Sequence, residues 1–508
     1  MNAWELQLAV GYRWRMVALL FAATTINYLD RSLLGVLAPT LQYDVFHWTD
    51  AEFAAISMAF KAAYAIGLLG AGALIDRWGT RLGYLISIAV WSSFGLMHTL
   101  IRPSFGWVGF LVARFGLGLG EAGNFPAAIK AVSSWFPAQE RALAAGIFNA
   151  GANIGAILAP ILVALIVQPG GVGWQFVFLV TATFSSIWCV TWWRTYREPE
   201  QHSRLTEAEL RWIQSDCTST SARAVTATWR AIMRQPITWN ISILRLADFA
   251  WWFYLFWGGK FLFDRFGLNI QALALPLITI YLFADAGSIG GGWISSRLIQ
   301  RGWPTVRARK SVMLGCALLI MPVASVTRLD TKFEVGATFF ARLSQTGAVL
   351  TPEQRAALNG MQGGSYASAR DFSVALDKVS AASPLNAPLK AACIAAARSN
   401  RLYWLATFLI AIAAAAHQAW AANMFSLIGD YLPRESVASV AGFSGMVGVL
   451  SSIVADILVG RALTQSGVNG YLVVFVCAGM AYLIVLALFH VLAPSMPRCV
   501  GMDYQQFS

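Results

Sequence analysis

GALIDRWGTR occupies residues 72–81, between two long runs of uncharged, mostly apolar residues. Three of its ten residues are charged: Asp76, Arg77 and Arg81. A run of about 20 apolar residues is long enough to cross the hydrocarbon core of a bilayer. The segment is therefore predicted to be a short polar loop that joins two membrane-spanning helices.

Similar strings return later in the chain. A degenerate copy reads GWISSR at 292–297, followed by RARK at 307–310. Likewise WFPAQER at 135–141 resembles DYLPRE at 430–435. Internal repeats of this kind are typical of transporters built from two related halves. The chain is therefore predicted to be a duplicated bundle of membrane helices.

The composition supports a membrane protein and excludes other classes. Of 508 residues, 57% are hydrophobic and 12% are charged, whereas soluble domains average about 25% charged residues. This excludes a disordered or nucleic-acid-binding protein and argues against an ordinary soluble enzyme. The net charge of +12 comes from loops between apolar runs, as the positive-inside rule predicts.

Twelve membrane spans are expected, in an all-α polytopic fold of two pseudo-symmetric six-helix bundles. The predicted domains are an N-terminal bundle at 1–195, a polar linker at 196–235, and a C-terminal bundle at 236–508. The twelve spans are expected near 16–40, 52–75, 83–101, 106–134, 142–167, 174–194, 238–262, 272–295, 311–328, 402–428, 436–460 and 468–493.

The distribution of Lys and Arg predicts the orientation. The linker and the loops on its side are rich in arginine, whereas 41–51 and 168–173 contain no Lys or Arg. Both termini and the linker are therefore expected in the cytoplasm. A long insert at about 329–401 then falls on the outer face, where its prolines and small polar residues suggest a loose cap. Within it, Thr351 to Gln354 predicts a helix start, and Cys393 is expected to be reachable by an impermeant thiol reagent that spares Cys217.

At this point the sequence resembles the major facilitator superfamily. Residues 72–81 match the loop signature of that family, Gly-x-x-x-Asp-Arg-x-Gly-x-Arg, at every defined position. The strings NYLDR at 27–31 and GLGEA at 118–122 are similar to the anion:cation symporter group. The strings WWFYLFW at 251–257 and HQAWAAN at 417–423 look most like bacterial hexuronate transporters. The resemblance implies that Asp76, Arg77 and Arg81 latch helices together on the cytoplasmic side.

A charged residue inside a span costs about 2.5–3.5 kcal/mol at the bilayer centre, and four such residues stand out in the first half. They are Asp30 and Arg31 in the first span, and Arg114 and Glu121, two helical turns apart, in the fourth. One interpretation is that they are ion pairs that only lock the two spans together. The other is a site where arginine holds a carboxylate with two hydrogen bonds. The resemblance assigns proton transfer to Asp30 and Glu121, carboxylate binding to Arg31, and orientation of the acids to Arg114.

Other polar or aromatic residues in facing spans could complete a substrate site, although ordinary interhelical hydrogen bonding is an equal alternative for each. These substrate-binding candidates are Lys61, Tyr64, Asn149, Asn153, Trp257, Gln418 and Asn423. Asp248 and Asp285, inside predicted spans of the second half, are further candidates for a direct role, although the sequence does not say which role.

The sequence therefore predicts a secondary transporter that imports an organic acid together with protons, and the resemblance implies that this acid is a hexuronate. The alternatives are another anion (an aldonate such as galactonate, a glucarate or an aromatic carboxylate) and, from other classes, a membrane-embedded enzyme or a transport-derived sensor. No catalytic, metal or cofactor constellation is visible, so no enzyme and no cofactor are expected. The expected partners are the anion, protons and lipid, without nucleic acid, for a monomer in the inner (plasma) membrane.

Overall fold

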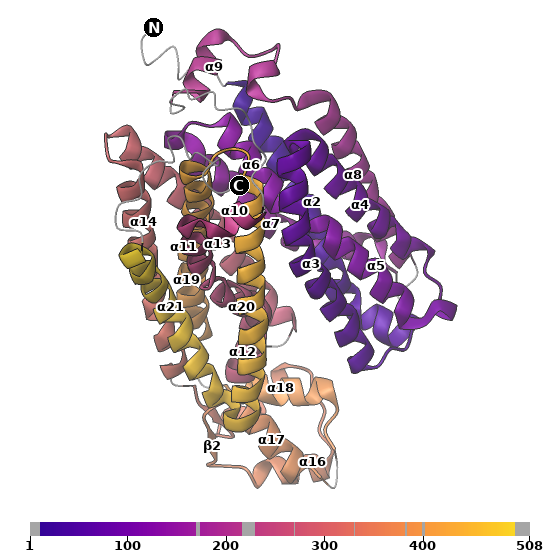
Figure 1. Ribbon diagram of the computed structural model, residues 1–508. Coiled ribbons are helices and arrows are strands. Elements are labelled where there is room, and N and C mark those ends of the chain that lie inside the picture. The colour runs from indigo at the N-terminus through magenta and orange to yellow at the C-terminus, as the bar shows by residue number, and fades with distance from the viewer. Residues whose placement is uncertain are drawn as a thin grey trace.

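The structure is a computed structural model, and it describes residues 11–168, 173–215, 229–268, 270–329, 331–381, 384–398 and 402–492. The first half of the chain is helical throughout (Figure 1). Its helices are α2 (Tyr12–Pro39), α3 (Asp50–Trp78), α4 (Thr80–Met97), α5 (Gly106–Glu121), α6 (Asn124–Trp135), α7 (Ala138–Ile166) and α8 (Trp174–Thr195). Short π- or 3₁₀-helical turns lie at Thr40–Val45, His98–Leu100, Pro103–Phe105 and Pro199–Gln201.

Two short helices follow in the linker region, and the second half then repeats the pattern with one insertion. The linker helices are α9 (Glu207–Ile213) and α10 (Trp229–Arg234). The long helices of the second half are α11 (Pro236–Arg245), α12 (Asp248–Phe266), α13 (Ile270–Gln300), α14 (Thr305–Ile320), α19 (Tyr403–Tyr431), α20 (Val437–Ser466) and α21 (Gly470–Leu492). Single 3₁₀ segments at Met321–Arg328 and Gly467–Asn469 extend α14 and precede α21.

The twelve predicted spans all correspond to helices. Among the described residues, nine helices are long and apolar enough to cross a membrane. The three other spans are α2, which carries the Asp30–Arg31 pair, and two spans that are interrupted. The fourth span breaks between α5 and α6, directly after Glu121, and the seventh breaks between α11 and α12. The sequence predicted each of these as one continuous helix, and that detail was wrong.

The two halves converge at one end of the molecule and diverge at the other (Figure 1). We call the end near α9 the linker side and the end near α16 (Pro352–Asn359) and α18 (Ala387–Ala397) the insert side. Near the linker side α7 packs against α13, and α3 packs against α20. Glycines permit this approach: a Cβ added at Gly72 would collide with the carbonyl oxygen of Ala438, and one at Gly442 with that of Leu68. The halves are therefore in close backbone contact on the linker side.

The insert is a folded unit, so the prediction of a loose cap was wrong. It contains α15 (Phe339–Gln345), α16 (Pro352–Asn359), α17 (Ala369–Val379) and α18 (Ala387–Ala397), with a two-stranded antiparallel sheet of β1 (Phe333–Glu334) and β2 (Ser365–Tyr366). The predicted helix start is confirmed, because Thr351 and Gln354 form a reciprocal cap on α16.

Apolar residues from all parts of the insert form a core of their own, which includes Phe333, Phe339, Phe372 and Leu376. Cys393 is fully buried in this core. The prediction that an impermeant thiol reagent reaches this cysteine in the folded protein was therefore wrong. Cys217 lies outside the described residues.

Candidate functional site

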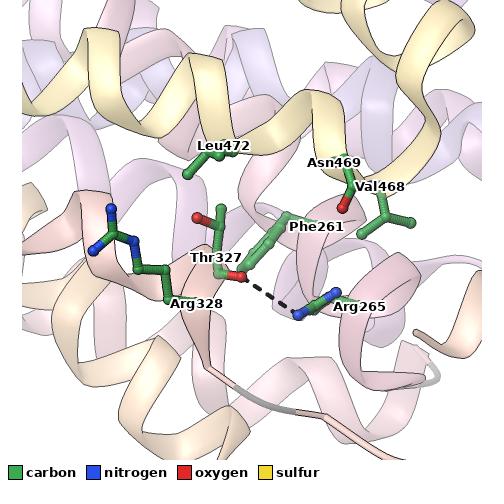
Figure 2. A pocket seen from close by; sticks show the side chains of 7 residues that line it. All are labelled: Phe261, Arg265, Thr327, Arg328, Val468, Asn469 and Leu472. Carbon is green, nitrogen blue, oxygen red and sulfur yellow. Dashed lines mark hydrogen bonds between the residues drawn. The ribbon is translucent and has the colours of Figure 1, made fainter. Parts of the chain in front are cut away.

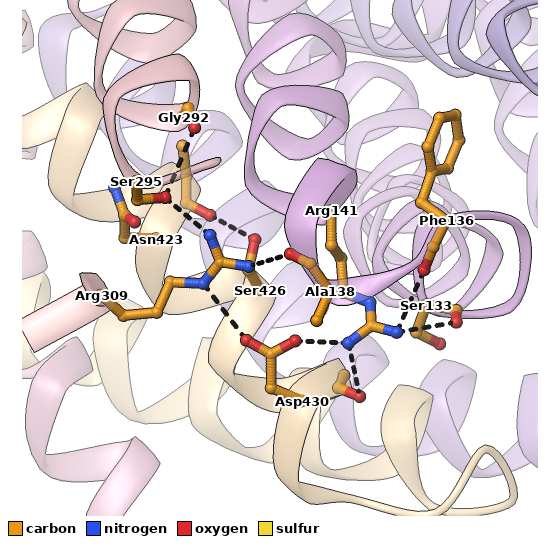
Figure 3. A network of polar contacts seen from close by, with 12 residues as sticks. Ser133, Phe136, Ala138, Arg141, Gly292, Ser295, Arg309, Asn423, Ser426 and Asp430 are labelled. Carbon is orange, nitrogen blue, oxygen red and sulfur yellow. Dashed lines mark hydrogen bonds and ion pairs between the residues drawn. The ribbon is translucent and has the colours of Figure 1, made fainter. Parts of the chain in front are cut away.

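A network of buried charges joins the two halves on the linker side (Figure 3). The carboxylate of Asp430 on α19 accepts hydrogen bonds from Arg141 of α7 and, at 3.2 Å, from Nε of Arg309 on α14. Arg309 is fully buried and also donates to the carbonyl oxygen of Ala138, at 2.7 Å. One carboxylate thus holds an arginine from each half, and the polar atoms are shielded from solvent.

The residues of the 72–81 loop have different partners. Asp76 accepts hydrogen bonds from Nζ of Lys130 at 2.7 Å and from the backbone N–H of Ser439 at 2.6 Å. Because Ser439 lies in the first turn of α20, this contact links the halves. Arg81 donates to the carbonyl oxygen of Trp193 at 2.6 Å and so joins α4 to α8 within the first half. Arg77 is exposed and forms no ion pair with any part of the chain that the structure describes.

A cavity lies between the two halves, near the middle of the long helices. The first half contributes aromatic and amide side chains, and the second half contributes charged, amide and aromatic ones. Its lining includes Tyr28, Tyr64, Phe125, Asn149, Arg245, Asp248, Trp251, Trp252, His417 and Gln418. The arrangement can surround a small polar molecule with hydrogen-bonding groups and flat apolar surfaces.

Arg31 lies directly behind the aromatic wall of this cavity. Its guanidinium carbon is 4.6 Å from the ring centre of Tyr28 and 4.5 Å from that of Tyr64. Nε and Nη2 both contact Oε2 of Glu121, at 3.0 and 2.9 Å. The Arg31 side chain keeps an exposed fraction of 11%, whereas that of Glu121 is fully buried. Nη1 has no hydrogen-bond partner among the described residues, so the cation retains a donor.

Asp30 and Arg114 complete the charged group of the first half, although they do not form a second ion pair at contact distance in the described structure. Asp30 is buried and lies beside Thr181 of α8. Arg114 is buried, close enough to Asp30 and Glu121 for electrostatic interaction, and packs over the ring of Phe60. The four charges predicted to cluster are therefore brought together, with Glu121 held by Arg31 rather than by Arg114.

Two of the predicted amides link the halves beside the cavity. Nδ2 of Asn149 donates to Oε1 of Gln418 at 2.6 Å, and both residues line the cavity. One turn further along α7, Nδ2 of Asn153 donates to Oδ1 of Asp285 at 2.6 Å. Asn423 points elsewhere: it is fully buried and donates to the carbonyl oxygen of Gly291 at 3.2 Å. Its position corresponds to helix packing and not to the cavity wall.

Lys61 and Trp257 lie outside the cavity lining, and both contact Asp456, a residue that the sequence analysis did not single out. Asp456 of α20 pairs with Nζ of Lys61 at 3.3 Å and accepts from Nε1 of Trp257 at 2.9 Å. The Lys61–Asp456 pair joins α3 of the first half to α20 of the second. It lies about two turns closer to the insert side than Leu68, where the backbones of these helices touch.

The sequence analysis also missed Arg245, which lines the cavity together with Tyr28 and Tyr64. Its Nη1 is 2.8 Å from Oδ2 of Asp248, so the two residues form an ion pair across the break between α11 and α12. Arg245 also lies over the ring of Phe425. The signal was present, because Arg245 follows ten uncharged residues and the cost of charges inside spans applies to it as well.

Comparison with known proteins supplies the family. The sequence pattern of the Major Facilitator Superfamily matches residues 20–368, more than half of the chain. The chain belongs to the Major Facilitator Superfamily. It is therefore a membrane transporter of twelve helices, as the sequence predicted.

Within this superfamily the chain resembles sugar-acid transporters. It is 34% identical to the galacturonate transporter of Dickeya chrysanthemi over 320 residues, which cover 61% of this chain and 90% of that protein. It is 35% identical to the hexuronate transporter of Escherichia coli (strain K12), over 61% of this chain and 72% of that protein.

The fold matches a solved superfamily structure along nearly the whole chain. The crystal structure of the transporter FucP in the outward conformation aligns with a TM-score of 0.60 and 12% identity, over 96% of this chain and all of that one. At this identity the likeness concerns the fold alone.

This superfamily member has a second pocket at the insert side of its second half (Figure 2). Phe261 and Leu472 form its apolar wall, and Arg265 and Arg328 lie at its polar edge. Arg265 donates to the carbonyl oxygens of Thr327 and Leu329, at 3.4 and 3.2 Å. These hydrogen bonds join α12 to the end of the 3₁₀ segment, so Arg265 stabilises the packing of these two elements.

Proposed function

We propose that the protein imports a hexuronate together with protons, by alternating exposure of the central cavity to the two sides of the membrane. The observation that carries this proposal is Arg31, which lies against Tyr28 and Tyr64 beside the cavity and whose Nη1, with two N–H donors, has no hydrogen-bond partner among the described residues after the pairing with Glu121. Arginine suits a carboxylate, because its planar fork matches the two oxygens. The two relatives named above support a hexuronate as the acid.

The charges of the site support proton coupling. Asp30 and Glu121 are balanced by Arg31 and Arg114, and in the second half Asp248 is balanced by Arg245. The sum is zero, so an incoming anion is uncompensated in a low-dielectric site unless a proton enters with it. Asp30 and Glu121 would accept that proton, and Arg114 would orient both acids.

The remaining residues divide by position. Tyr64, Asn149 and Gln418 line the cavity and would contact the hydroxyls of the sugar. Asn153, one turn from Asn149, would act through Asp285. Lys61 and Trp257 would meet the substrate on its way from the insert side, where they hold Asp456. We propose no substrate contact for Asn423, because its amide is occupied by helix α13.

Orientation belongs to the same proposal. The linker side would face the cytoplasm and the insert side the exterior of the inner (plasma) membrane, as the arginine-rich linker indicates. Asp76 and the Asp430 network would then close the cytoplasmic side, while the protein works as a monomer without cofactor. Arg81 would stabilise the first half only.

An uptake screen with the purified full-length chain in proteoliposomes tests the proposal. Glucuronate and galacturonate are expected to accumulate against a concentration gradient when the exterior is acidic, and to equilibrate only when the pH gradient is collapsed. Galactonate, glucarate and an aromatic carboxylate test the alternative anions. Equal accumulation with and without the pH gradient would refute proton coupling. The absence of sugar-acid uptake would refute the proposed substrate class.

A further inference from the structure

The ion pair of Arg245 and Asp248 lies where the seventh span is interrupted. Asp248 is 7% exposed, and its Oδ2 is 2.8 Å from Nη1 of Arg245. Both residues line the central cavity, on the wall that the second half provides. Because Asp248 begins α12 directly after the break, the backbone places the carboxylate at the cavity surface instead of inside a continuous helix.

Each partner keeps unused hydrogen-bonding capacity. Nε of Arg245 and Oδ1 of Asp248 are buried and have no hydrogen-bond partner in the described part of the chain. Leaving buried polar atoms without partners is costly, so such atoms in a cavity wall indicate a ligand site. Helix α20 makes room for the pair: a Cβ at Gly448 would be 2.7 Å from Oδ2 of Asp248, and one at Gly445 would be 3.2 Å from Nη2 of Arg245.

An aromatic surface adjoins the pair. His417 stacks on Trp251, with ring centres 5.2 Å apart and planes 6° from parallel. Nδ1 of His417 is 2.6 Å from the hydroxyl oxygen of Tyr482, which fixes the orientation of the imidazole. Trp251 and His417 both line the cavity. A sugar ring has an apolar face of C–H groups, and flat aromatic side chains suit it.

We propose that the Arg245–Asp248 pair recognises the uncharged end of the substrate and that Asp248 excludes acids with a second carboxylate. This inference rests on the proposed function, in which Arg31 takes the single carboxylate of the sugar acid. A hydroxyl group both donates and accepts, so it satisfies Oδ1 of Asp248 and Nε of Arg245 together. A carboxylate only accepts, and it would lie beside the Asp248 anion in a buried site. The pair thus selects by an unfavourable contact as well as by favourable ones.

The experiment compares two acids that differ at one carbon. Galactarate carries a carboxylate at C1, where galacturonate has its aldehyde or hemiacetal carbon. Uptake of labelled galacturonate by the full-length chain in proteoliposomes is measured against increasing unlabelled galacturonate or galactarate. The measured ratio is the concentration of galactarate that halves uptake divided by that of galacturonate. In the unmodified protein this ratio is expected to be at least ~10. In Asp248→Asn it is expected to fall by ~10-fold or more, because Arg245 becomes free to bind the second carboxylate.

Matched variants isolate the cause. Asp264→Asn makes the same chemical change on the same helix, where Asp264 pairs with Lys260 outside the cavity lining, and it is expected to leave the ratio unchanged. The double variant Arg245→Gln with Asp248→Asn removes both charges and is expected to gain no galactarate binding. Asp248→Glu keeps the anion and is expected to keep the exclusion.

Several results would overturn the inference. The first is an unchanged ratio in an Asp248→Asn protein that still takes up galacturonate. The second is a double variant in which galactarate competes as strongly as it does in Asp248→Asn. The third is equal competition by both acids in the unmodified protein. The last measurement needs no variant, so the inference stays testable if Asp248→Asn does not fold. Failure of the unmodified protein to take up any sugar acid would instead refute the proposed function.

Discussion

Arg31 differs from an ordinary buried ion-paired arginine because its guanidinium lies against two phenol rings while Nη1 has no hydrogen-bond partner among the described residues. Contact with the rings and the pairing with Glu121 restrict how the guanidinium can turn, so the two N–H donors of Nη1 are held in place. A lysine at this position keeps the charge but loses the planar fork and the stacking.

We therefore expect Arg31→Lys to weaken hexuronate binding by about 10- to 100-fold, the range for lost hydrogen bonds to a charged group. Substrate-induced thermal stabilisation of the detergent-purified protein measures this. Arg77→Lys, at an exposed position, is the control and is expected to bind as the unmodified protein does. Equal affinity in both variants would remove Arg31 from the site.

Neutralising the acids tests the coupling. Glutamine at 121 mimics the protonated side chain, so Glu121→Gln is expected to lose accumulation driven by a pH gradient while still exchanging labelled for unlabelled substrate. Asp30→Asn is expected to lose both, since Asp30 adjoins the arginine that binds the carboxylate. If both variants still concentrate substrate, the charges are structural and the coupling proposal is wrong.

The charged residues of the first half could be predicted because a charge within an apolar run is conspicuous in the sequence. Their pairing could not: Glu121 pairs with Arg31 in another helix, while Arg114, on its own helix, has no contact ion pair in the described structure. Pairing depends on which helix faces are opposed, which sequence spacing within one helix does not reveal. Asp456 was overlooked for the same reason, as its partners lie on α3 and α12.

Two elements are interrupted next to the site, and the sequence predicted neither interruption. α5 ends at Glu121 and α11 ends at Arg245, so each break adjoins a charged residue of the central region. The glycines between 116 and 123 indicated close helix packing, but they are equally compatible with a continuous helix. What distinguishes the two outcomes is tertiary contact: Gly120 packs against the backbone of Trp91, and Gly123 packs against Ser87.

Helix α20 offers a matched pair of glycines for a test at this scale. In Gly448→Ala the new methyl group would lie 2.7 Å from Oδ2 of Asp248, so the carboxylate must move. Because overpacking costs about 1–3 kcal/mol, substrate affinity is expected to fall by about fivefold or more. Gly460→Ala changes the same helix where nothing lies within 4 Å, and it is expected to leave affinity unchanged. Similar losses in both variants would indicate a general effect on α20.

At the scale of the whole molecule, the contacts described between the halves are unequal at the two ends. Asp430 holds Arg141 and Arg309 on the linker side, with backbones in contact nearby, whereas Lys61 and Asp456 pair through partly exposed side chains toward the insert side. The relative energies of these contacts decide which side opens. The two bundles themselves were predictable, because repeats, span lengths and loop charges are all encoded locally.

Asp430→Asn is expected to favour opening of the linker side, since it leaves two buried arginines without their carboxylate, at a cost of about 3–5 kcal/mol. Spin labels on α6 and α14, near the linker side, would report longer distances. Glu200→Gln is the control: Glu200 is exposed and its partner Arg434 is partly exposed, and exposed pairs contribute about 0–1 kcal/mol. Unchanged distances in Asp430→Asn would mean that backbone packing alone keeps this side closed.

Topology can be checked at the insert. Val349, which is 87% exposed, replaces the buried Cys393 as the reporter. In intact cells Val349→Cys is expected to react with an impermeant maleimide, and the unmodified protein is expected to react only after denaturation. Labelling of Val349→Cys in inside-out vesicles alone would reverse the orientation.

The insert also leaves and rejoins the helical bundle at adjacent points, because Phe333 near its beginning forms a backbone bridge with Arg398 near its end. The segment between these residues folds around its own core. For the helices on either side, α14 and α19, it therefore acts as a closed loop, and the entropy of closing a loop rises by only about 0.6 kcal/mol for each doubling of its length. A transporter can gain, lose or exchange such a module at this junction with little effect on the free energy of assembling its membrane helices.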